Sequence, residues 1–125
     1  MLITTLYVAL GGALGAAARF LLGAAMLRAT GPTAFPLPIL TANVVGSLLM
    51  GIFVVLAAQR GWTHAAPFVM TGLLGGFTTF SAFSLETVTL IERGQTGLAA
   101  AYIGASVALS IGALMLGLAI ARALA

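Results

Sequence analysis

Four apolar stretches, separated by short polar breaks, constrain the fold of this chain more than any other feature. They cover approximately residues 2–27, 37–58, 67–91 and 97–121. Each is long enough to cross a membrane as a helix, which takes about 20 mostly apolar residues. The first break contains Gly31, Pro32 and Pro36, which end helices and favour a loop. The sequence therefore predicts an all-α integral membrane protein, with four transmembrane helices in a single domain that spans residues 1–125.

The composition points to the same class of protein. Hydrophobic residues make up 62% of the chain and charged residues only 6%, whereas a soluble domain has about 25% charged residues. The absence of cysteine excludes disulfides and thiolate metal sites. The net charge of +3 forms no basic stripe, so nucleic-acid binding is not indicated. No charge precedes Arg19, and we therefore expect the first stretch to be a mature helix and not a signal peptide.

The arginines are balanced between the two predicted sides of the membrane. Arg60 and Arg122 lie on the side of both termini, and Arg28 and Arg93 lie on the other. Because an excess of positive loops normally sets the orientation, this balance predicts dual topology; control of the orientation by Arg19 is the alternative. Four short helices form a thin bundle, so a pathway would lie between subunits, which favours a two-fold dimer.

Polar side chains recur within the apolar stretches, where an unpaired polar group is costly. Their spacing places them in groups on single helix faces: Asn43 and Ser47, then Thr79 and Glu86 if that helix is continuous, and finally Tyr102, Ser106 and Ser110. Ordinary helix packing is one interpretation of such stripes. Three stripes together, one of them with an asparagine, favour a polar pathway instead.

The segment GGFTTFSAFS at residues 75–84 is the most unusual part of the third stretch. Each glycine costs a helix roughly 1 kcal/mol relative to alanine, so the pair Gly75-Gly76 predicts a break near Gly75–Thr79. The carbonyl groups freed by a break would suit a hard cation such as sodium. The alternative is close helix packing through Gly72 and Gly76.

Three phenylalanines, Phe77, Phe80 and Phe83, form an aromatic face in the same segment. The edge of an aromatic ring is positive, so edge-on rings can support an anion; lipid-facing or core positions are the alternative. Arg19 and Glu86 are the charges inside the predicted membrane and are functional candidates for that reason. Snorkelling of Arg19 to the interface is the alternative for that residue.

Three sequence blocks resemble the signature blocks of the Fluc (CrcB) family of fluoride channels. They are GGALGAAARF at 11–20, TANVVGSLLMG at 41–51 and GLLGGFTTFSAFSLE at 72–86. The length and the four-helix layout match over the whole chain. The resemblance implies a multi-pass protein of a bacterial or archaeal inner membrane, which forms an antiparallel dual-topology homodimer in the lipid bilayer. Its two pores would let cytoplasmic fluoride leave passively down its electrochemical gradient, giving fluoride resistance.

The resemblance also implies roles for single residues. Asn43 would donate its amide to fluoride, and the rings of Phe80 and Phe83 would contact the ion edge-on. The remaining pore residues would be Thr79, Ser81, Ser84, Glu86, Tyr102, Ser106 and Ser110. Backbone carbonyls of Gly75 and Thr78 would hold a structural Na⁺ at the dimer axis, and Arg19 matches the first-helix arginine, with a structural or interface role. Ala82 departs from the family, since many members have threonine there, and we expect conduction to survive with a changed rate.

Two other classes of function remain possible at this stage. Small multidrug exporters are also four-helix, dual-topology dimers, but they depend on a glutamate in the first helix, where this chain has Arg19 and no acid. Glu86 would have to take that role. A scaffold subunit without transport activity would leave the asparagine, hydroxyl and aromatic pattern unexplained. The sequence shows no catalytic pair at helical spacing and no metal-ligand cluster, so we do not expect an enzyme.

Overall fold

Four long apolar helical spans make up the computed structural model, which describes residues 1–124. The spans are α1 (Leu2–Thr30), α2 (Leu37–Arg60), a composite third span (Thr63–Glu92) and α5 (Thr96–Leu124). The expected all-α architecture with four membrane-spanning helices is confirmed. The spans extend slightly beyond the predicted apolar stretches because helix ends carry polar residues such as Arg28 and Arg60, which hydropathy alone assigns to loops.

The third span changes its helical geometry several times. A short 3₁₀ turn η1 (Thr63–Ala65) leads into a π-helix η2 (Pro67–Leu74), which continues into one turn of α-helix, α3 (Gly75–Phe77). Thr78 and Thr79 are extended, and α4 (Phe80–Glu92) follows. Thr79 caps α4, because its hydroxyl oxygen accepts a hydrogen bond from the backbone nitrogen of Ala82 at 3.1 Å.

Glycines bring α1 and the third span into backbone contact. Gly11 and Gly15 are the buried residues of α1, and they face the segment that contains Gly72 and Gly76. A Cβ atom on Gly72 would lie 2.8 Å from the carbonyl oxygen of Val8, which is closer than real side chains approach. Such small residues are typical of helix pairs in membranes, where close packing replaces the hydrophobic effect.

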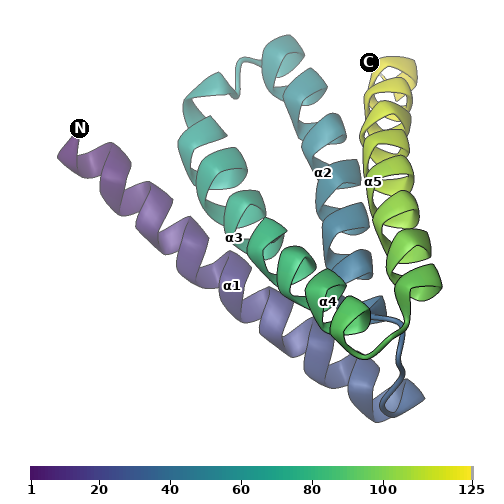
Figure 1. The fold of residues 1–125 in the computed structure, drawn as a ribbon. Coiled ribbons are helices and arrows are strands. Elements are labelled where there is room, and N and C mark those ends of the chain that lie inside the picture. The colour runs from purple at the N-terminus through teal and green to yellow at the C-terminus, as the bar shows by residue number, and fades with distance from the viewer. Residues whose placement is uncertain (125) are drawn as a thin grey trace.

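Helices α2 and α5 run in the same direction and lie side by side (Figure 1). Gly51 and Gly117 make this contact possible, since a Cβ atom on either would lie 3.0 Å from a backbone nitrogen of the other helix. A small apolar core sits near the start of both helices and contains Leu40, Leu90 and Tyr102.

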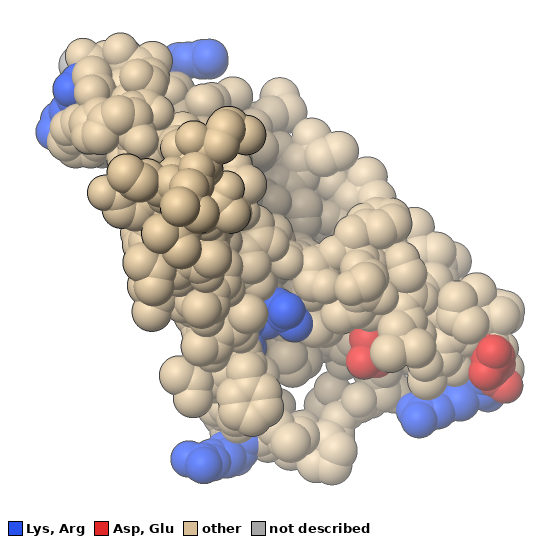
Figure 2. Space-filling view, turned by 90° about the vertical axis from the view of Figure 1, so that its left-hand side faces the viewer, with Lys and Arg blue, Asp and Glu red and all other residues tan. Residues whose placement is uncertain are grey.

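Most large apolar side chains point away from the bundle. Leu10 and Leu14 of α1 and Ile111 and Met115 of α5 are each more than half exposed. Figure 2 shows basic side chains at both ends of the molecule and a wide, mostly uncharged surface between them. An exposed apolar surface of this kind is energetically favourable only in contact with lipid or with another apolar protein surface. The four spans therefore lie in a membrane.

Candidate functional site

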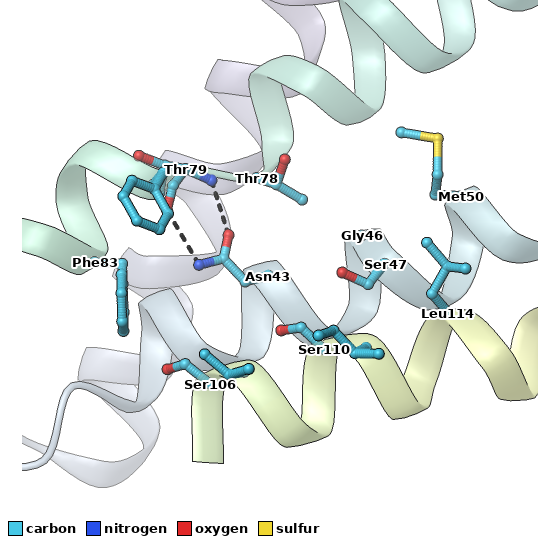
Figure 3. Close-up of a pocket in the computed structure, with 13 residues that line it drawn as sticks. Asn43, Gly46, Ser47, Met50, Thr78, Thr79, Phe83, Ser106, Ser110 and Leu114 are labelled. Atoms are coloured by element: carbon cyan, nitrogen blue, oxygen red, sulfur yellow. Dashed lines mark hydrogen bonds between the residues drawn. The ribbon is translucent and has the colours of Figure 1, made fainter. Parts of the chain in front are cut away.

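A cleft of about 400 Å³ opens where α2, α4 and α5 meet the extended Thr78–Thr79 segment (Figure 3). Among the described residues that line it, none is charged. The lining consists of hydroxyl and amide groups, two phenylalanines and several aliphatic side chains: Asn43, Gly46, Ser47, Met50, Thr78, Thr79, Phe80, Phe83, Ser106, Val107, Ser110, Ile111 and Leu114. The cleft therefore offers hydrogen-bond donors on an otherwise apolar wall, without a fixed charge.

Asn43 joins α2 to the extended segment through both ends of its amide. Its Nδ2 donates to the carbonyl oxygen of Thr79 at 3.1 Å, and the backbone nitrogen of Thr79 donates to its Oδ1 at 2.8 Å, as the dashed lines in Figure 3 show. An amide nitrogen carries two hydrogen atoms, and the Thr79 bond uses one of them. Asn43 thus provides hydrogen-bond partners for the backbone N–H and carbonyl of Thr79, which lie outside a helix. Its second amide hydrogen remains available for another acceptor. Sequence reasoning missed the first of these roles.

The predicted site residues fall into groups in the structure. One group lines the cleft: Asn43, Thr79, Phe80, Phe83, Ser106 and Ser110. Ser81 and Ser84 do not line it; the Ser81 hydroxyl lies 3.3 Å from that of Thr79, and the Ser84 hydroxyl donates to the carbonyl of Phe80 at 3.0 Å. Glu86 lines a second, separate cleft.

Aromatic rings form a continuous series that starts at the cleft. The ring centroids of Phe80 and Phe83 are 5.4 Å apart, those of Phe83 and Tyr102 are 5.2 Å apart, and Phe35 meets Tyr102 edge to face at 5.6 Å. Phe80 is 79% exposed, so the first ring projects out of the chain, whereas Tyr102 is completely buried. The sequence did not predict that Phe35 joins this series, because Phe35 lies in a loop between prolines, where helical spacing cannot indicate neighbours.

Two buried hydroxyl groups stand beside this series. Among the described residues, the hydroxyls of Tyr102 and Ser106 are buried and have no hydrogen-bond partner within the protein. Nearly all buried polar groups in proteins are paired with protein or with ordered water. Each of these two hydroxyls can therefore form a hydrogen bond with a water molecule or an ion.

The carbonyl groups of Gly75 and Thr78 have lost the donors that a continuous helix would supply. The nitrogen of Thr79, which would donate to Gly75, donates to Asn43, and the nitrogen of Ala82, which would donate to Thr78, donates to the Thr79 side chain. Free carbonyl oxygens are suitable ligands for a hard cation, so the residues present fit a sodium ion.

Arg19 reaches the same region from α1. Its Nε donates to the carbonyl oxygen of Gly76 at 3.3 Å, and the side chain is half-buried. This bond occupies another carbonyl close to the end of α3. Arg19 therefore ties α1 to the chain just before it becomes extended.

Together, the four spans and the neutral, donor-lined cleft define a small multi-pass membrane protein with a polar site between its helices. The family model described as "CrcB-like protein, Camphor Resistance (CrcB)" matches residues 6–118, and the chain belongs to this family. The resemblance seen in the three sequence blocks is thereby confirmed. Membership in this family leaves the exporter and scaffold interpretations without support.

Several bacterial relatives are similar over nearly the whole chain. The chain is 66% identical over 122 residues to a protein named "Fluoride-specific ion channel FluC" from Ruegeria, covering 98% of this chain and 97% of that protein. Proteins with the same name from Roseobacter denitrificans and Cereibacter sphaeroides are 64% identical over 116 residues and 60% identical over 122 residues. These alignments cover 92% of both chains for Roseobacter, and 98% of this chain and 97% of the relative for Cereibacter. The four spans and these relatives confirm the expected localisation, a multi-pass protein of the inner membrane.

Proposed function

We propose that the chain is a fluoride-selective ion channel, which lets cytoplasmic fluoride leave the cell passively and so gives fluoride resistance. It is a transporter and not an enzyme. The names of relatives support this function, among them one that is 66% identical over 122 residues. The observation that carries it is the cleft itself, in which Asn43, several hydroxyls and two phenylalanines meet without a charged residue among the described lining.

The chemistry of the cleft suits a small, strongly hydrated anion. Fluoride gives up water only if dense hydrogen-bond donors replace it. The second amide hydrogen of Asn43 and the hydroxyls of Ser106 and Ser110 would supply such donors, and the ring edges of Phe80 and Phe83 would add a weak positive potential. A fixed positive charge would hold the ion too strongly for release, so a neutral lining favours conduction.

A second copy of the chain would complete the pathway. The cleft opens to the outside of the single chain, and Phe80 is 79% exposed beside it. We propose an antiparallel, dual-topology homodimer with two pores at the interface, which the balanced arginines at the two ends of the molecule support. A structural Na⁺ on the two-fold axis would bind the carbonyls of Gly75 and Thr78 and offset the cost of anions nearby.

The proposal is tested by ion efflux from liposomes that contain the purified protein. Vesicles are loaded with potassium fluoride or potassium chloride, valinomycin is added, and the external anion is followed with a selective electrode. We expect rapid loss of fluoride and no loss of chloride. Phe80→Leu should reduce the fluoride rate, whereas Phe20→Leu is the matched control, because Phe20 is 73% exposed on α1 and does not line the cleft. Equal loss of both anions, or loss of neither, contradicts the proposal.

A further inference from the structure

Gly46 is the one glycine among the described residues that line the first cleft, and the roles described so far do not involve it. It is buried within α2, three residues after Asn43, so both residues lie on the same face of that helix. Asn43 bonds to the backbone of Thr79, and Gly46 lies against the side chain of the preceding residue, Thr78 (Figure 3). Helix α2 therefore contacts the extended segment at two adjacent points.

The contact between Gly46 and Thr78 leaves no room for a side chain. A Cβ atom on Gly46 would overlap the Cγ2 methyl of Thr78 and would lie 3.3 Å from Cδ2 of Phe77. Carbon atoms pack at about 3.5–4.0 Å, so the Thr78 methyl would have to move by roughly 1 Å or more. The Phe77 ring can yield by a small rotation. The Thr78 methyl cannot, because it is attached directly to a branched Cβ atom with few allowed rotamers.

Thr78 is held in place by two hydrogen bonds to one carbonyl group. Its backbone nitrogen and its Oγ1 donate to the carbonyl oxygen of Leu74 at 3.0 and 2.9 Å. The methyl and the hydroxyl of a threonine share one Cβ atom, so rotation about χ1 moves both together. The methyl can therefore avoid a Cβ atom added at Gly46 only if the hydroxyl bond breaks or the backbone of Thr78 shifts.

A shift of Thr78 is transmitted to Asn43 through a single peptide group. The peptide that joins Thr78 to Thr79 contains the nitrogen that donates to Oδ1 of Asn43 at 2.8 Å. A displacement of roughly 1 Å takes such a bond beyond its usual upper limit of about 3.2 Å. The two bonds to Thr79 also fix the plane of the Asn43 amide, and with it the direction of the second Nδ2 hydrogen.

From these contacts we propose that Gly46 is a positioning residue, which holds the extended segment where Thr79 orients the amide of Asn43 toward the cleft. Gly46 itself does not touch the ion; the absence of its side chain leaves the space that the Thr78 methyl occupies. This inference rests on the proposed function, because Asn43 transmits the effect to fluoride. Since the cause is one steric contact, removal of the Thr78 methyl should cancel the effect of a methyl added at Gly46.

The first test is a rescue experiment, with fluoride efflux from liposomes normalised to the amount of folded protein. Gly46→Ala should slow efflux by about tenfold or more, as a misplacement of roughly 1 Å in a functional site does. In the Thr78→Ser protein, which keeps the hydroxyl and lacks the methyl, the same Gly46→Ala change should alter the rate far less. Gly23→Ala is the matched control, because its Cβ would lie 3.9 Å from that of Pro38, an ordinary contact, and it should keep the wild-type rate.

The outcomes of the rescue experiment are decisive in both directions. Wild-type efflux in Gly46→Ala overturns the proposal. So does a Gly46→Ala effect that is as large in the Thr78→Ser protein as in the wild type. If Gly46→Ala alone does not fold, a double variant that folds and conducts supports the proposal, and a double variant that also fails to fold overturns it.

The second test measures energetic coupling from the free energy of unfolding in mixed detergent micelles. Alanine is a better helix former than glycine, so a loss of stability in Gly46→Ala must come from the contact with Thr78, and Thr78→Ser should relieve it. If the added methyl breaks the bonds between Asn43 and Thr79, Asn43→Ala should cost less in the Gly46→Ala protein than in the wild type. Additive losses from Gly46→Ala and Asn43→Ala overturn the positioning role. A wild-type protein without fluoride efflux overturns the proposed function, while the unfolding measurements still decide whether Gly46 positions the segment.

Discussion

The two hydrogen bonds between Asn43 and the backbone of Thr79 predict that Asn43→Ala loses stability as well as conduction. The bonds are 3.1 and 2.8 Å long and half-buried. Each contributes about 1 kcal/mol, and the unpaired Thr79 groups add a desolvation penalty that water in the open cleft partly relieves. We expect a total loss of about 3 kcal/mol in the free energy of unfolding, or roughly a hundredfold in the equilibrium constant. The assay is unfolding in mixed detergent micelles, followed by circular dichroism, beside fluoride efflux from liposomes.

Two further variants separate the structural role of Asn43 from contact with the ion. Ser47→Ala is the matched control, because Ser47 lies one turn further along α2 in the same cleft, and its stability should stay close to that of the wild type. Asn43→Asp keeps the acceptor for the Thr79 nitrogen and loses the donor, so it should lose about 1 to 2 kcal/mol, while its negative charge should abolish fluoride efflux. An Asn43→Ala protein as stable as the wild type would refute the reasoning.

Three other substitutions test contacts outside this pair. Gly15→Ala should destabilise the protein by about 2 kcal/mol or more in the same unfolding assay, because its Cβ would overlap the backbone carbonyl of Leu73; Gly97→Ala, which meets no atom within 4 Å, should not destabilise it. Thr79→Val removes the cap of α4 and should cost about 1 kcal/mol, whereas Thr79→Ser should retain it; equal losses would argue against capping. Phe35→Leu removes the edge-to-face contact with the buried Tyr102 ring and should cost about 1 kcal/mol in the unfolding assay, whereas Phe35→Tyr should retain the contact; equal stability of both variants would argue against it.

Hydropathy along the chain was sufficient to determine the membrane class and the four spans. This is so because transfer into lipid depends mainly on local composition, and a window of about 20 residues already contains that information. The sequence blocks around Arg19, Asn43 and Phe80 were likewise enough to indicate the family. Helical spacing grouped Asn43 with Ser47 and Ser106 with Ser110, and the structure brings these four residues to one cleft.

The pairing between distant segments was decided only by the tertiary structure. Asn43 and Thr79 are 36 residues apart, and Arg19 and Gly76 are 57 apart, so no local pattern couples them. The α-helical periodicity of the sequence also failed to predict which side chains share a face where the backbone changes its geometry. The third span is π-helical over Pro67–Leu74 and extended at Thr78 and Thr79.

The pair Gly75-Gly76 indicates a weak region of the third helix, but the helix is interrupted a few residues later, at Thr79. There the Asn43 side chain forms hydrogen bonds with the backbone groups of Thr79 that have no partner within a helix. The same geometry separates Glu86 from the first cleft and assigns it to the second, although the sequence groups it with Thr79. A seven-residue spacing places two side chains on one face only in an uninterrupted helix, and Thr79 precedes the first turn of α4.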